Sequence, residues 1–304
     1  MNTGRHTYGI FSSTSGLFRG LLMMLFASAN PTMEAASQTL YLGVTGGGSD
    51  YQGELRDGMF NINGLRPAFG GGLLFAPLER FSVNAEFAMG TLGGSDRHNR
   101  YYFARRRNLH FDTRITEWSI TGRVNLKVGN EAVAIPYLMS GLALFKVDPF
   151  TTGPDGQREY LYPLSTEGQG ISGTGNPPHR STNFSIPIGG GIELRLTRQM
   201  RLDLELASRK TFTDYIDDVG NSYPDGYTLL SERGTAAFEL SYRGDELPGG
   251  DPSFPLAGTL RGNPRTKDWY SFIVLRLRYP IFSRSYRYDR INSILKGSDW
   301  PYRN

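Results

Sequence analysis

The chain has 304 residues, no cysteine, 38 glycines, 17 tyrosines and 18 phenylalanines, with a net charge of +4. Only 38% of the residues are apolar, and none of the apolar runs approaches the roughly 20 residues that a membrane-spanning helix needs. A helical membrane protein, disulfides and thiolate-bound metals are therefore excluded, and the small net charge gives no indication of nucleic-acid binding. The high glycine and aromatic content, with short alternating segments, suits an all-β chain.

Residues 1–36 have the pattern of a secretory signal peptide. Arg5 and Arg19 precede the apolar stretch 21–26, and small residues follow from Ala27. A charged start, a short apolar core and small residues at the cleavage site are the features of such a leader. We expect the mature chain to begin between Asn30 and Gln38, although an amphipathic or disordered leader remains an alternative. Without cysteine, the exported product is not a lipoprotein.

Alternation of apolar and polar residues is the main structural signal in the rest of the chain. Between Glu117 and Val128, the even positions carry Trp118, Ile120 and further apolar residues, whereas the odd positions are polar. About 9–11 residues are needed for a tilted strand to cross a bilayer, and this stretch is of that length. Eight such segments are expected, at 40–47, 68–76, 81–91, 117–128, 136–147, 183–196, 200–212 and 269–279. The first two are short and glycine-rich, and 136–147 is too apolar for its faces to be assigned.

The connections between these segments alternate strictly in length. Those at 77–80, 129–134 and 197–199 are short, whereas those at 48–64, 93–112, 148–182 and 213–267 are long. Short periplasmic turns and longer outer loops are typical of an outer-membrane barrel. We therefore predict a closed antiparallel eight-stranded outer-membrane β-barrel at 38–282, with both ends in the periplasm and a periplasmic tail at 283–304.

The polar faces of the predicted strands carry many charges. An eight-stranded barrel has room inside only for side chains, so these groups should form structural salt bridges rather than a conduction path. The predicted network comprises Glu86, Glu117, Arg123, Lys127, Glu193, Arg195, Asp203, Glu205, Arg276 and Arg278, with Arg201 and Arg209 on the same faces. A soluble barrel of the lipocalin type, with its apolar face inside, is the alternative. Aromatic residues near strand ends (Phe81, Trp118, Trp269 and Tyr279) favour the membrane form.

Catalytic and cofactor sites are not indicated. The four histidines, His6, His98, His110 and His179, have no spacing that suggests a metal pair or an orienting acid, and the mature chain has no Gly-x-Ser-x-Gly motif. The aspartates Asp214, Asp217 and Asp218 could bind a cation, but they lack the register of a calcium loop. We interpret them as the solvated start of a loop, and we predict no enzyme activity, no cofactor and no metal.

Several junctions between loops and strands are more distinctive than composition requires. They contain Arg66, Pro67, Asn108, Glu167, Gly168, Gln169, Gly170, Arg209, Lys210, Thr211, Asp214, Tyr215, Asp217, Asp218, Arg261, Gly262, Asn263, Pro264, Asp268, Trp269 and Tyr270. In this order the motifs resemble the Bacteroidota outer-membrane β-barrel family that includes the PorG subunit of the type IX secretion system, over roughly residues 40–279. The basic and aromatic tail at 283–304 departs from that pattern.

The resemblance implies a barrel embedded among outer-membrane lipids that associates with periplasmic secretion-ring proteins, including a lipoprotein. It implies no enzymatic activity. Two hypotheses for function follow. The first is a component or assembly factor of a type IX secretion complex. The second is a stand-alone surface barrel whose outer loops, especially 213–267, bind a ligand or other molecules.

Overall fold

A computed structural model describes residues 37–56, 64–129, 132–197 and 199–285. The predicted signal peptide and the tail from residue 286 onward lie outside the described residues.

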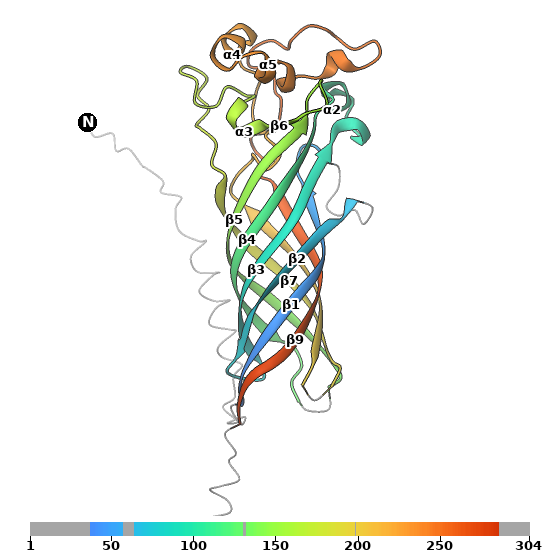
Figure 1. The fold of residues 1–304 in the computed structure, drawn as a ribbon, viewed down its shortest axis with the longest axis vertical. Helices are drawn as coiled ribbons and strands as arrows, with labels where there is room; N and C mark the ends of the chain where they lie inside the picture. The colour runs from blue at the N-terminus through green and yellow to red at the C-terminus, as the bar shows by residue number, and fades with distance from the viewer. Residues whose placement is uncertain (1–36, 57–63, 130–131, 198, 286–304) are drawn as a thin grey trace, which may run out of the picture. The chain divides into compact units, whose positions relative to one another are not determined.

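Eight long strands form one closed barrel (Figure 1). Each is antiparallel to the next, and the ring closes because β9 pairs with β1 and β4 pairs with β5. A short ninth strand, β6 (Arg158–Tyr160), pairs antiparallel with residues 150–152 at the outer end of β5. The prediction of an eight-stranded antiparallel barrel is confirmed. The barrel strands are β1 (Ser37–Gln52), β2 (Arg66–Ala76), β3 (Phe81–Ser95), β4 (His110–Asn125), β5 (Ala134–Thr152), β7 (Thr182–Arg195), β8 (Arg201–Thr211) and β9 (Trp269–Ser285).

Side chains on each strand point alternately into the barrel and away from it. On β4, Glu117 and Thr121 are buried inside, whereas Trp118 and Ile120 on the outer face are 65% and 64% exposed. The faces of β5, which the sequence left unassigned, follow the same rule: Leu138, Leu142 and Leu144 point outward.

The outer wall is apolar and the inner wall carries the charges. Exposed side chains on the wall include Val44, Phe69, Trp118, Leu142 and Phe184, each more than 60% exposed. A soluble protein rarely presents so extended an apolar surface to water, and a lipocalin-type barrel would place it inside. The polarity is instead that of a barrel surrounded by lipid, so the soluble alternative is excluded.

Short turns and long loops lie at opposite ends of the barrel. The strand pairs β2–β3, β4–β5 and β7–β8 are joined by the turns 77–80, 126–133 and 196–200. The helices gather at the other end (Figure 1). They are η2 (Asp96–His98), α2 (Tyr102–Arg107), α3 (Leu161–Leu164), α4 (Gly226–Arg233), α5 (Thr235–Ser241) and η3 (Gly244–Glu246). Within the described part of the chain, no helix combines the length and apolarity needed to cross a bilayer.

A hydrophobic core joins the outer loops to the upper part of the barrel. Ile216, Val219 and Leu240 from the last long loop pack with barrel residues such as Phe111 and Tyr270, and all are at most 4% exposed. Burying a side chain of this size contributes about 1.5–3 kcal/mol. The loop from β8 to β9 is therefore a packed cap on the outer end of the barrel.

Candidate functional site at the periplasmic mouth

The middle of the barrel interior is filled by ion pairs. Arg276 Nη2 lies 2.6 Å from Glu86 Oε2, and its Nη1 lies 2.9 Å from Glu205 Oε2. Because all three side chains are buried, these contacts offset the cost of removing the charges from water.

A second pair lies further toward the outer end. Arg209 Nε and Nη2 each donate to a Glu117 carboxylate oxygen at 3.1 Å, and the Tyr270 hydroxyl donates to Glu117 Oε2 at 2.7 Å. Arg209 also lies over the Phe272 ring, 4.4 Å from its centroid. Charged and aromatic side chains thus fill this region of the lumen.

The residues predicted to form the interior network are distributed along the barrel. Glu86, Glu117, Glu205 and Arg276 form the pairs just described, with Arg209. Lys127 lies beyond the end of β4 and is exposed, so the structure does not bring it into the lumen. The remaining members line the periplasmic end: Arg123, Glu193, Arg195, Asp203 and Arg278.

Many of the distinctive motif residues meet in the cap. Arg261 Nη1 lies 3.1 Å from Glu167 Oε1 and donates to the Asp218 carbonyl at 2.6 Å. Glu167 Oε1 also accepts from the Gly220 amide at 3.1 Å, while Asp218 accepts from the Thr166 hydroxyl. Burial of Glu167 raises the pKa of its carboxyl, and the charge of Arg261 opposes that rise.

A second group of contacts ties the cap to the barrel rim. The Tyr51 hydroxyl of β1 donates to Asp217 Oδ2 at 2.5 Å and to Asp268 Oδ1 at 3.2 Å. The Ile216 amide donates to Asp268 Oδ2 at 2.9 Å. Arg107 from α2 pairs with Asp96 through two contacts of 2.7 Å and donates to the Arg261 carbonyl. The sequence motifs therefore coincide with the polar framework that closes the outer end.

The other motif residues have local structural roles. Asn108 adopts the left-handed conformation (φ 59°) at the end of α2, and Gly168 and Gly170 have φ values of 70° and 76°. Arg66 pairs with Asp112, and Thr211 Oγ1 donates to the Asp268 carbonyl at 2.5 Å. The rest are placed as follows: Pro67 opposite Gly48, Lys210 opposite Trp269, Gln169 buried beside Glu167, Tyr215 edge-on to His179, Gly262 against Gly220, and Asn263 and Pro264 near Glu54 and Lys267.

His179 has an acidic neighbour that its sequence spacing did not suggest. Its Nε2 lies 3.0 Å from Asp218 Oδ1, and its ring stacks on Tyr162 with 4.3 Å between centroids. The neighbouring chain segments are far apart in sequence, so no local motif could have indicated this contact. Packed between two tyrosine rings, His179 fastens the loop after β6 to the cap.

Of the three aspartates that the sequence singled out, Asp214 joins an acidic cluster, with Glu54 and Asp268 as its other members. Ligand oxygens of Glu54, Asp214 and Asp268 lie within 4.8 Å of one another, a geometry among the described residues that could hold a cation. Asp217 and Asp218 are instead hydrogen-bonded elsewhere in the cap. All three aspartates are buried, so the interpretation of them as the solvated start of a loop is wrong. Burial and the negative charge of Glu54 raise the pKa of Asp214 to about 7, while Lys267 Nζ, 3.3 Å away, opposes the rise.

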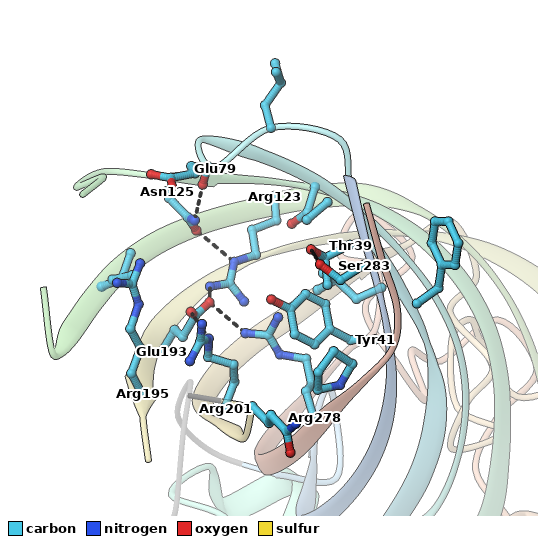
Figure 2. A pocket seen from close by; sticks show the side chains of 18 of the residues that line it. Thr39, Tyr41, Glu79, Arg123, Asn125, Glu193, Arg195, Arg201, Arg278 and Ser283 are labelled. Atoms are coloured by element: carbon cyan, nitrogen blue, oxygen red, sulfur yellow. Dashed lines mark hydrogen bonds and ion pairs between the residues drawn. The ribbon is translucent and has the colours of Figure 1, made fainter. Parts of the chain in front are cut away.

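An open cavity of about 510 Å³ lies at the periplasmic end of the lumen (Figure 2). Figure 2 shows side chains from β1, β4, β7, β8 and β9 directed into it. Its charged lining residues are Glu79, Arg123, Glu193, Arg195, Arg201 and Arg278. Tyr41, Asn125 and Gln199 add hydrogen-bonding groups. We refer to this cavity as the periplasmic mouth.

One carboxylate organises most of the arginines in the periplasmic mouth. Glu193 lies 2.5 Å from Arg123, 2.7 Å from Arg278 and 3.4 Å from Arg201. Asp203, just inside the mouth, lies 3.2 Å from Arg123 and 2.7 Å from Arg278. Arg123 also stacks 3.6 Å from the centroid of the Tyr137 ring. The guanidinium groups are thus held in fixed positions, and their positive charge faces the opening.

A closed eight-stranded barrel with an apolar outer wall and an ion-paired interior defines this protein as an outer-membrane β-barrel. The chain matches the family described as "Domain of unknown function (DUF6089)" over residues 18–233, and it belongs to that family. No curated protein matches it.

Solved structures of small barrels resemble it in fold at low sequence identity. Neisserial surface protein A is 7% identical, with 80% of this chain and 97% of that chain covered and a TM-score of 0.40. Ail, the attachment invasion locus protein of Yersinia pestis, in complex with sucrose octasulfate, is 10% identical, with coverage of 82% and 100% and a TM-score of 0.36. The N-terminal barrel of Pseudomonas aeruginosa OprF is 9% identical, with coverage of 80% and 99% and a TM-score of 0.33.

Proposed function

We propose that this protein is a non-enzymatic component or assembly factor of a type IX protein secretion complex. The observation that carries the proposal is the difference between the two ends of the barrel. The outer end is closed by a packed polar and apolar cap, whereas the periplasmic end opens into a cationic cavity. A barrel of this kind offers its fixed binding groups to the periplasm, where secretion-ring proteins would be found.

The filled lumen argues against a pore. Arg276, Glu86 and Glu205 span the interior, and Glu117 with Arg209 forms another barrier above them. The order of the loop motifs, which resembles the barrel family that includes the PorG subunit, supports the secretion role. In this proposal the chain is exported with a cleaved signal peptide at 1–36 and contacts outer-membrane lipids through its wall. Residues 283–285, predicted to begin the tail, belong to β9. The periplasmic mouth and the tail from residue 286 onward contact ring proteins, including a lipoprotein.

Deletion of the gene tests the proposal. We expect secretion of type IX cargo to fall in the deletion strain, and we expect a tagged copy of the barrel to co-purify with ring proteins. Complementation with the wild-type gene should restore both. Unchanged secretion together with no co-purifying ring protein would contradict the proposal.

A stand-alone surface barrel is the second candidate function. An external groove of about 1060 Å³ near the outer rim favours it, because exposed Phe103 and Leu260 line this groove with Leu206 of the wall and Trp269. Tyr227 and Leu256 in the cap are also more than 75% exposed. In this case partners would be captured through the outer loops of intact cells, and substitutions in the periplasmic mouth would leave capture unchanged.

A further inference from the structure

The periplasmic mouth contains like charges in direct cross-strand register. Arg195 of β7 is paired with Arg201 of β8, and Arg201 is in turn paired with Arg278 of β9. Like charges placed opposite each other on neighbouring strands destabilise a sheet. Such a row is stable only where negative charge lies among the guanidinium groups.

The carboxylates of the barrel supply only part of that negative charge. Four arginines and two glutamates line the cavity, and Asp203 beneath it adds a third carboxylate. Glu193 is shared among three arginines, and Glu79 is an exposed residue in the turn after β2. Cations therefore outnumber carboxylates at this end of the lumen.

One buried donor group at the periplasmic mouth also lacks a hydrogen-bond acceptor. Arg278 is 2% exposed, and its Nε–H group has no hydrogen-bond acceptor among the described residues. Guanidinium groups are planar donors that match carboxylates in two-point contacts. A carboxylate entering the cavity would meet donors that are already positioned.

We propose that the periplasmic mouth is a binding site for an acidic peptide segment of a periplasmic protein, whose carboxylates enter among Arg195, Arg201 and Arg278. This inference rests on the proposed function, from which the periplasmic location of the partner is taken. The cavity volume of about 510 Å³ admits several side chains. The chain's own tail does not suit the site, because residues 286–304 contain four basic residues and two acidic ones.

Binding of a defined peptide to the purified full-length barrel in a zwitterionic detergent tests the inference. The probe is a fluorescein-labelled peptide of alternating glutamate and serine, compared with the same peptide carrying lysine in place of glutamate. We expect the acidic peptide to bind at low salt and the basic one not to bind. In the double variant Arg195→Gln/Arg201→Gln, the acidic peptide should bind about tenfold more weakly or worse.

The double variant Arg97→Gln/Arg265→Gln is the matched control, because both are exposed arginines in the outer loops and their replacement removes the same two positive charges without touching the mouth. Migration before and after boiling shows that each variant is folded. The inference would be overturned if the double variant and the wild type bound the acidic peptide with equal affinity. It would also be overturned if the barrel bound inorganic phosphate but did not bind the acidic peptide. Because this assay contains no secretion machinery, its failure is distinguishable from failure of the secretion proposal.

Discussion

Arg209 on β8 and Glu117 on β4 meet inside the barrel in a two-point ion pair, with both N–O distances at 3.1 Å. Both side chains are at least 94% buried. Substitution Glu117→Ala leaves the Arg209 guanidinium buried without its carboxylate, which should cost about 3–5 kcal/mol. We expect the urea midpoint of the barrel in detergent micelles to fall accordingly, measured from migration of folded and unfolded bands.

The double variant Glu117→Leu/Arg209→Met separates charge from packing. When both charges are replaced by apolar side chains of similar volume, the decrease in the free energy of unfolding should be far smaller than in Glu117→Ala. Equal losses in the two variants would mean that packing around Tyr270 and Phe272, rather than the unpaired charge, sets the cost.

The cap should open when its central ion pair is broken. Arg261 joins Glu167, the Asp218 carbonyl and the Ser241 carbonyl, and it is 2% exposed. In Arg261→Ala we expect faster hydrogen exchange in residues 214–220, while the amides of the barrel strands stay protected. The exposed Arg265→Ala serves as control. If exchange in the cap is the same in both variants, Arg261 does not hold the cap closed.

Strand alternation was predictable because the bilayer and the lumen make opposite demands on the two faces of each strand. On β4, Trp118 and Ile120 face lipid while Glu117 and Thr121 face inward. The alternation of apolar and polar residues in the sequence therefore predicts which side chains point outward. On β5 the sequence does not distinguish the two faces of the strand, because inward-facing Tyr137, Met139 and Phe145 are themselves apolar or aromatic. Tyr137 is accommodated inside by the Arg123 guanidinium and by a hydrogen bond to Glu205.

The outer ends of the strands were underestimated for a related reason. β4 begins at His110 rather than at 117, and β1 continues to Gln52 rather than ending at 47. Above the bilayer, the outer faces no longer need to be apolar, because loops and water cover them. On β4 the alternation continues with reversed polarity, since Phe111 and Ile115 are buried inside while Asp112 and Arg114 point outward, so the apolar face no longer marks the lipid side.

Side-chain pairing within the site could not be predicted from one sequence. Which charges meet inside a barrel depends on strand register and on the tilt around the ring, neither of which local patterns determine. Arg195, Arg201 and Arg278 were each assignable to an inner face, but their adjacency follows only from the β7–β8 and β8–β9 registers. Similarly, Arg261 meets Glu167 only once the last two long loops fold together.

Close strand contact makes Gly141, among other glycines of the barrel wall, intolerant of a larger side chain. A Cβ atom on Gly141 of β5 would lie 2.1 Å from the Ile120 carbonyl oxygen of β4. Gly141→Ala should therefore destabilise the barrel by about 1–3 kcal/mol through displacement of the neighbouring strand. Gly46→Ala on β1 is the matched control, since a Cβ there would meet nothing within 4 Å. Equal unfolding midpoints for the two variants would contradict this account.

The cap should become less stable as pH rises toward neutrality. Burial and the charge of Glu54 raise the pKa of Asp214 from its ordinary 3.8 to about 7, and burial likewise raises the pKa of Asp217 and Asp268. Between pH 3.8 and about 7, Asp214 of the folded cap holds a proton that it does not hold in the unfolded loop. The resulting stabilisation is fully present below pH 3.8 and is lost as pH rises through about 7.

Hydrogen exchange at the Ile216 and Val219 amides, corrected for intrinsic rates, measures this effect, because these amides donate to Asp268 and Asp217. We expect their opening free energy to be larger at pH 5 than at pH 8. In Asp214→Asn the difference should shrink, since the position no longer ionises and the repulsion from Glu54 is removed at every pH. A pH dependence that is undiminished in Asp214→Asn would assign the effect to the other acids of the cap whose pKa values are raised, Glu54, Glu167, Asp217 and Asp268, and Asp214 would then contribute no proton linkage to the cap.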